Sequence, residues 1–74
     1  MLKNDVGIYA GTIWQHLSER GFLTIRKIGE LTGLKESHIF LALGWLLRED
    51  KIRFVDKNGL LHVGLIDSIL ETDY

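Results

Sequence analysis

Cysteine, long apolar runs and a clear excess of one charge are all missing from this chain. Without cysteine the chain can form neither a disulfide framework nor a thiolate metal site. The apolar runs are far shorter than the roughly 18 residues that a membrane helix needs, and none follows residues 1–5 as it would in a signal peptide. These absences favour an ordinary cytoplasmic protein that does not enter a membrane.

The charge balance disfavours a strongly basic nucleic-acid-binding protein. Nine Lys and Arg stand against ten Asp and Glu, which gives a formal net charge of −1 and a pI near 6.3. Modules that bind nucleic acids usually carry a basic excess. Three of the ten acids lie in residues 67–74, which hold no base, so residues 1–66 carry a net charge of +2. We therefore expect a mildly basic body and an acidic end.

The apolar residues near the start of the chain predict a first helix. Asn4 or Asp5 can cap this helix, and Gly21 is a good C-terminal stop. Residues 22–23 follow as a very short strand. The apolar positions at helical spacing in the first helix are Val6, Ala10, Ile13, Trp14 and Leu17.

Two further helices are predicted on either side of a turn at Gly33. Thr24 is the expected N-cap of the second helix. The third helix begins at Lys35 or Ser37 and runs to about Glu49. The inner face of the second helix carries Ile25, Ile28 and Leu31, and that of the third carries Ile39, Leu43, Leu46 and Leu47.

After the third helix the apolar period changes from about 3.6 residues to two. Residues 52–55 are predicted as a strand, 56–59 as a turn, and 60–65 as the returning strand. The sequence leaves the conformation of residues 66–74 open. This order of elements is that of a winged helix-turn-helix, an α+β fold whose C-terminal hairpin forms the wing. The alternative is an unrelated three-helix bundle with an appended hairpin.

The predicted third helix is apolar on a second side as well. Leu41 and Trp45 fall opposite to its core-facing residues. Because a small domain needs only one apolar face per helix, the second face requires another partner. That partner is either another chain or the C-terminal segment of the same chain, whose Ile69 and Leu70 also need cover.

A winged helix can contact DNA through the outward side of its third helix and through its wing. The candidate DNA-binding residues on these elements are Lys35, Ser37, His38, Arg48, Lys51, Arg53 and Lys57. Arg26 and Lys27 of the second helix could add contacts. The outward side offers no Asn or Gln, however, and Glu36 at its leading end would repel phosphates. The pattern therefore favours a hydrophobic contact patch over base reading, and any DNA binding should be weak and salt-sensitive.

A stripe of small and aromatic residues runs along the first helix and includes Gly7, Gly11 and Trp14. Each Gly in a helix interior costs about 1 kcal/mol relative to Ala, so two of them four residues apart suggest a close neighbour. That neighbour belongs either to the same chain or to a second copy in a homodimer. The candidate interface residues are Gly7, Gly11, Trp14, Leu41, Trp45, Ile69 and Leu70.

No active site is evident in the sequence. His16, His38 and His62 are too scattered for a recognisable metal motif. No Ser, His and acid grouping indicates a nucleophile, and no glycine-rich loop has phosphate-binding spacing. We therefore expect a protein that is not an enzyme and that has no catalytic residue, metal, cofactor or small-molecule ligand.

Several blocks of the sequence resemble a known family. They include Ala10-Gly11 followed by Ile13-Trp14, and the LALGWL block at residues 41–46. Together with the Leu-Thr-Gly-Leu turn at residues 31–34, they are similar to small stand-alone winged helix-turn-helix proteins of bacteria and archaea, a family of unknown function. The resemblance covers about residues 6–63. It implies the fold and, by analogy alone, a link to transcription regulation, but no residue roles.

The sequence thus predicts one winged helix domain over residues 1–74, with frayed ends at 1–4 and 71–74. We expect a cytoplasmic, homodimeric, non-catalytic module that binds double-stranded DNA weakly as a transcription regulator. The alternative is a protein–protein interaction module that has this fold without binding DNA and uses the exposed apolar face of its third helix.

Overall fold

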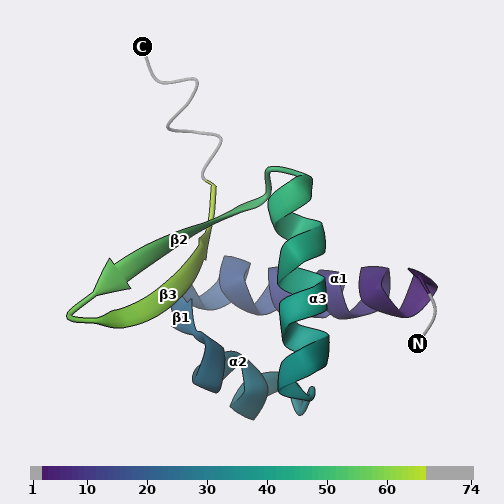
Figure 1. The fold of residues 1–74 in the computed structure, drawn as a ribbon, viewed down its shortest axis with the longest axis horizontal. Helices are drawn as coiled ribbons and strands as arrows, with labels where there is room; N and C mark the ends of the chain where they lie inside the picture. Colours follow the sequence, from purple (N-terminus) through teal and green to yellow (C-terminus); the bar gives the residue numbers. More distant parts are fainter. Residues whose placement is uncertain (1–2, 67–74) are drawn as a thin grey trace.

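Three helices and a small antiparallel sheet form the domain, as the sequence predicts (Figure 1). This computed structural model describes residues 3–66. The elements in chain order are α1 (Lys3–Arg20), β1 (Leu23–Thr24), α2 (Ile25–Thr32), α3 (Glu36–Arg48), β2 (Ile52–Lys57) and β3 (Leu60–Leu65). None of the helices in this part of the chain is long and apolar enough to cross a membrane.

The predicted cap of α1 is wrong. Asn4 and Asp5 both lie inside the helix, and Lys3 is helical too, although residues 1–4 were predicted to fray. An acid in the first turn interacts favourably with the positive end of the helix dipole. Asp5 can therefore stabilise this end from within the first turn rather than as a cap.

The core lies where the three helices meet the inner face of the sheet. In Figure 1, α1 passes behind α3 and crosses it steeply. The buried hydrophobic residues are Ala10, Ile13, Leu17, Leu23, Ile28, Ile39, Ala42, Leu43, Leu46, Ile52 and Val63. All three helices and all three strands contribute at least one buried residue to this cluster. Every element is therefore anchored in the core.

The burial of α3 corrects two of our expectations. Leu47 was predicted to face the core but is 48% exposed, and Ala42 is fully buried instead. The buried arc of α3 centres between Ile39 and Leu46, and a residue at the position of Leu47 points past its edge. Trp45 was predicted to lie opposite the core, but it is half-buried and packs against the core from the side facing α1.

Local signals fix the ends of α2. The Thr24 side chain accepts a hydrogen bond from the Lys27 backbone N–H at 3.1 Å, as expected of an N-cap. Gly33 ends the helix in the left-handed region, with φ of 73° and its N–H bonded to the Gly29 carbonyl. Both predicted boundaries of this helix are confirmed.

The junction between α3 and β2 is a tight turn. The Lys51 N–H donates to the Leu46 carbonyl at 2.9 Å, and the Asp50 N–H donates to the Leu47 carbonyl at 3.0 Å. This is the Schellman arrangement, which requires a left-handed residue after the helix. Asp50 fills that position with φ of 58°, where glycine is more common. The turn sends β2 back across the core.

The sheet has the strand order β1-β3-β2 with antiparallel neighbours. β2 and β3 form the predicted hairpin, and β2 extends two residues further than predicted, to Lys57. Asn58 and Gly59, with φ of 56° and 79°, make the two-residue turn, which suits the twist of a hairpin. β1 pairs with β3 by placing Leu23 opposite Val63. The hairpin is therefore joined to the middle of the chain.

Candidate nucleic-acid and protein interface

The outward side of α3 is largely apolar. We call this side the exposed α3 face, and it carries Ser37, Phe40, Leu41, Gly44, Leu47 and Arg48. Phe40, Leu41 and Leu47 are each about half exposed, at 52%, 51% and 48%. Large apolar side chains gathered on an open helix face are typical of protein interfaces. Arg48 is the one long polar side chain in this set.

The leading end of α3 offers little for base recognition. Lys35 is the N-cap residue and is exposed, without a side-chain capping bond. Glu36 places an acid in the first turn. The His38 ring is half-buried and stacks on Tyr9 of α1, with ring centroids 5.2 Å apart and planes 14° from parallel. That stack occupies one face of the ring inside the domain, so Lys35 and Ser37 remain the accessible polar groups here.

The three bases of the wing do not lie together. Arg53 and Lys57 point to the outer face of the sheet, where the Arg53 guanidinium carbon lies 5.3 Å and the Lys57 ammonium 4.9 Å from the centroid of the Phe22 ring. Lys51, which precedes β2, lines a hollow together with Trp14 of α1 and Trp45 of α3. The sequence grouped these three bases on the hairpin, and it did not show that Lys51 lies on a different surface from Arg53 and Lys57.

Phe22 is the residue that sequence reasoning missed. It was predicted only as part of a short strand, but its ring lies on the outer face, against Gly64 of β3. We call Phe22, Arg53 and Lys57 the cation–aromatic cluster. Its members are separated by up to 35 positions in the sequence, and only the pairing of β1 with β3 brings them together. No spacing rule could have shown this.

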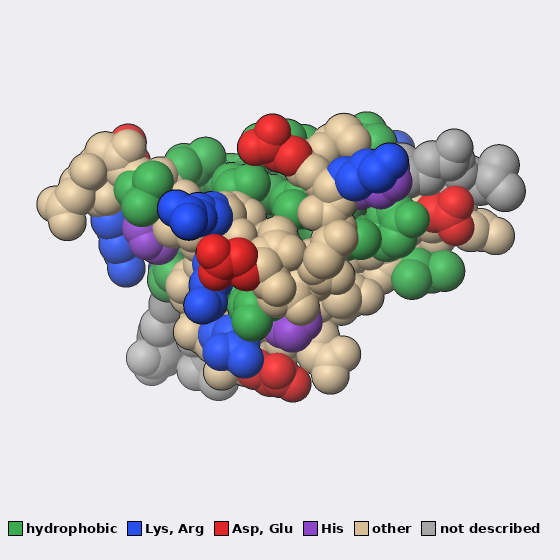
Figure 2. Space-filling view, turned by 90° about the horizontal axis from the view of Figure 1, so that it is seen from below, with side chains coloured by type: hydrophobic (Ala, Val, Ile, Leu, Met, Phe, Trp, Pro, Cys, Tyr) green, Lys and Arg blue, Asp and Glu red, His purple; other side chains and the backbone are tan. Residues whose placement is uncertain are grey.

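The cations of α2 are already engaged. Arg26 and Lys27 lie 3.4 Å and 3.7 Å from the carboxylate of Glu30, one helical turn away. Figure 2 looks at the molecule from below and shows Lys and Arg side chains interspersed with acidic and apolar ones. The positive charge on this view is divided among separate positions, so its field is weak at a distance.

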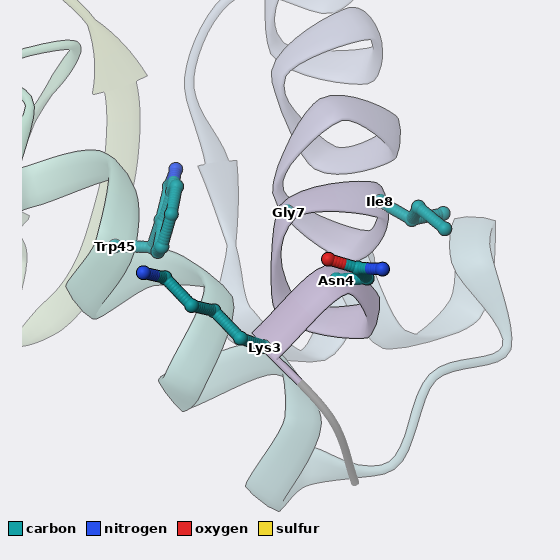
Figure 3. Close-up of a pocket in the computed structure, with 5 residues that line it drawn as sticks. All are labelled: Lys3, Asn4, Gly7, Ile8 and Trp45. Carbon is teal, nitrogen blue, oxygen red and sulfur yellow. The ribbon is translucent and has the colours of Figure 1, made fainter.

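A shallow groove runs between α1 and α3. It consists of two adjoining hollows of about 610 Å³ and 280 Å³, which share Gly7 and Trp45. We call it the α1–α3 groove, and its lining includes Lys3, Gly7, Gly11, Trp14, Trp45 and Lys51. In Figure 3 the side chain of Lys3 extends toward Trp45, and Gly7 lies on the side of α1 that faces Trp45.

The two glycines of α1 face open space in the described part of the chain. A Cβ built on Gly7 or Gly11 would have no atom of another element within 4 Å, and the same is true of Gly44 in α3. Residues 3–66 therefore contain no close neighbour that explains these glycines. Trp14, 44% exposed, lies on the same groove. The structure thus brings Gly7, Gly11, Trp14 and Trp45 together, whereas Ile69 and Leu70 lie outside the described residues.

The histidines do not gather. His16 lies on α1, His38 stacks on Tyr9, and His62 on β3 has its Nδ1 2.9 Å from the Leu60 carbonyl oxygen. Among residues 3–66 no group of three or more His, Cys, Asp or Glu side chains is arranged to hold a metal ion. The exposed α3 face, the cation–aromatic cluster and the α1–α3 groove are therefore the candidate functional surfaces considered for residues 3–66.

The arrangement of helices and hairpin defines a winged helix-turn-helix domain. The chain belongs to the family described as the winged helix-turn-helix domain DUF2582, which matches residues 1–65 and confirms the resemblance seen in the sequence. The solution NMR structure of protein BT2368 from Bacteroides thetaiotaomicron is similar, with 31% sequence identity and a TM-score of 0.83. The match covers 100% of this chain and 89% of that one. No curated protein matches the chain.

Proposed function

We propose that this protein is a non-catalytic, homodimeric winged helix module that binds double-stranded DNA through its phosphate backbone and acts in transcription regulation. The observation that carries the proposal is the pair of cations on one face of the wing, Arg53 and Lys57, next to a helix-turn-helix. Phosphate contacts position a protein on DNA without reading its sequence. This role suits a domain whose third helix has few groups for base edges, and it agrees with the cytoplasmic location expected from the sequence.

The proposed contacts predict weak and strongly salt-dependent binding. Lys35, Arg48, Arg53 and Lys57 provide four contacts at most, with Ser37 as a neutral donor. His38 stays a weaker candidate because its ring stacks on Tyr9. Four neutralised phosphates give a slope of about −3.6 in log affinity against log salt concentration. Fluorescence anisotropy of a labelled random duplex, measured from low to physiological salt, tests this; no binding at the lowest salt would refute the proposal.

The α1–α3 groove supports the homodimer. Two glycines that weaken α1 without any neighbour in residues 3–66 fit a close contact with a second copy, and exposed Trp14 adds apolar surface beside them. A two-fold axis would place the same groove of each copy against the other. Sedimentation analysis of the purified protein should show a dimer. A monomer at high micromolar concentration would refute this part of the proposal.

A second function is favoured by one specific observation. The exposed α3 face presents three half-exposed apolar side chains, Phe40, Leu41 and Leu47, where a sequence-specific regulator would present polar ones. The alternative is a protein–protein interaction module that keeps the winged helix fold. It predicts a dimer or complex whose formation depends on Leu41, together with no salt-dependent binding of DNA. The same anisotropy series separates the two functions.

A further inference from the structure

Two cations of the wing converge on one aromatic ring. Arg53 and Lys57 are four residues apart on β2, which corresponds to about 13 Å along a strand. Their charged ends nevertheless lie 5.3 Å and 4.9 Å from the centroid of the same Phe22 ring. The two side chains must therefore lean toward each other along the strand. Phe22 lies at the point where they meet.

The two cations share one neighbouring ring, and the attraction of each cation to that ring offsets their mutual repulsion. Neither Arg53 nor Lys57 forms an ion pair with an acid among residues 3–66. The electron-rich face of Phe22 attracts both cations, by about 0.5–1 kcal/mol each at an exposed site. Asp56, between them in the sequence, points to the opposite face of the hairpin because side chains alternate along a strand. The cluster is thus locally positive.

Gly64 provides the space for the ring. A Cβ at this position would lie 2.5 Å from Phe22 Cε2 and within 2.8 Å of two further ring atoms, so the ring would have to move to make room for it. Gly64 pairs with Arg53 across the hairpin, so the ring lies directly beside the Arg53 position. A glycine inside a strand weakens the strand and often marks such a close approach. Glycine at position 64 therefore lowers the stability of the sheet, but it leaves room for the Phe22 ring.

We propose that Phe22 is a positioning residue that holds Arg53 and Lys57 together as a phosphate-binding pair on the outer face of the sheet. Gly64 leaves the space that the Phe22 ring occupies. The cluster contains five guanidinium and three ammonium N–H donors and no acceptor, so its ligand is an anion. Arg can bind a phosphate with two parallel hydrogen bonds while Lys adds a point charge. This inference rests on the proposed DNA binding and assigns one part of it to a named site.

The test compares Phe22→Leu with Phe22→Tyr. Leucine keeps an apolar side chain but removes the aromatic face, whereas tyrosine keeps that face. Binding to a random duplex is measured by anisotropy across a salt series, and thermal unfolding by circular dichroism confirms that each variant is folded. We expect Phe22→Leu to lower affinity at low salt on the order of tenfold and to flatten the salt slope, and Phe22→Tyr to behave like the wild type. Equal binding by Phe22→Leu would overturn the proposal.

A second comparison distinguishes positioning from simple packing. In a protein that already carries Arg53→Gln and Lys57→Gln, Phe22→Leu should have no further effect on DNA binding, because Phe22 acts through the two cations. A full additional loss in that background would contradict the inference. If the wild type itself fails to bind DNA at low salt, both the inference and the proposed function are wrong. If the wild type binds and Phe22→Leu binds equally well, only the inference is wrong.

A measurement on the unmodified protein supplies a check that does not depend on any variant folding. The Arg53 side-chain Nε–Hε signal in an NMR titration with the duplex should shift together with the Phe22 ring protons. A titration in which other residues respond while these two signals stay fixed would place the phosphates elsewhere and overturn the assignment.

Discussion

The outer face of the sheet and the α1–α3 groove each place aromatic side chains beside glycine, with opposite results. At Gly64 an added Cβ would collide with the Phe22 ring at 2.5 Å, so the space that glycine leaves is filled within the chain. At Gly7 and Gly11 an added Cβ would have no neighbour within 4 Å in the described structure. The same residue type thus marks a completed contact in one region and an open surface in the other.

The two regions therefore differ in how much of a binding site the chain forms by itself. In the cation–aromatic cluster the two cations already lie over a ring of the same chain, so less ordering of side chains is needed when a phosphate binds. In the groove, Trp14 and Trp45 flank a hollow that the described residues leave unfilled. A helix that carries two unexplained glycines is less stable than it could be, and a partner that approaches α1 closely would account for that loss.

Charge reversal on the wing should give the largest effect. In the variant with both Arg53→Glu and Lys57→Glu, two attractive contacts become repulsive, so we expect DNA affinity at low salt to fall on the order of 30-fold or more. The matched control is Lys51→Glu, which changes the charge of a residue on the groove side of the hairpin. Anisotropy should show a much smaller loss of DNA affinity for the control. Equal losses of affinity would mean that it does not matter whether the charge lies on the outer face of the wing or on the groove side.

Substitution of the glycines sharpens the contrast between the two regions. Gly7→Ala and Gly11→Ala should each stabilise the dilute monomer by about 1 kcal/mol, which raises its melting temperature by about 4–8 °C. Gly64→Ala should lower the melting temperature, because Phe22 must move. Thermal melts at low protein concentration measure all three. Loss of dimer mass in sedimentation by Gly7→Ala and Gly11→Ala, although the dilute monomer is stabilised, would locate the second copy on the groove. Destabilisation of the dilute monomer would contradict the open space at these glycines.

The exposed α3 face can be tested by adding a charge. Phe40→Lys replaces a half-exposed apolar side chain, so the free energy of unfolding should change by no more than about 0.5 kcal/mol. If α3 faces DNA, the new cation adds about one phosphate contact and makes the salt slope steeper by about 0.9. An unchanged slope, with loss of self-association or of a bound protein, would assign this face to protein contacts instead.

The smallest effect on DNA binding is expected at the turn between α3 and β2. Asp50 adopts a left-handed conformation that glycine adopts without strain. Asp50→Gly should therefore stabilise the domain slightly, by about 0.5–1 kcal/mol, with no change in DNA affinity. Urea unfolding measures the stability. A destabilised variant would show that the Asp50 side chain contributes an interaction that outweighs the strain.

Local sequence patterns predicted most of the helix and strand boundaries, because interactions within a few residues determine these boundaries. The Thr24 cap, the Gly33 stop and the Asn58–Gly59 turn each act within a few residues. The errors lie where distant segments decide the outcome. Leu47 fell on the predicted core face of α3, but the packing of α1 and the sheet against that helix centres the buried arc on other residues. Periodicity alone gives a face only to within about one residue position.

The candidate sites were predictable only in part, for the same reason. The sequence named Arg53 and Lys57 because the alternation along a strand makes them outward-facing. It did not name Phe22, since the contact depends on β1 pairing with a strand near the other end of the chain. It did group Gly7, Gly11 and Trp14, because helical spacing alone places them on one side of α1. Residue spacing cannot show whether a second copy occupies that side, because this depends on how well the two surfaces fit each other.

The two-residue strand β1 has a consequence for how the domain responds to a ligand. By pairing Leu23 with Val63, it joins the hairpin to the buried core, so the wing cannot swing away as an independent arm without exposing both residues. Local opening of the wing is then part of global unfolding. An anion that binds the folded wing and not the unfolded chain consequently raises the melting temperature of the whole protein. In thermodynamic terms, this short strand makes the wing and the core a single cooperative unit.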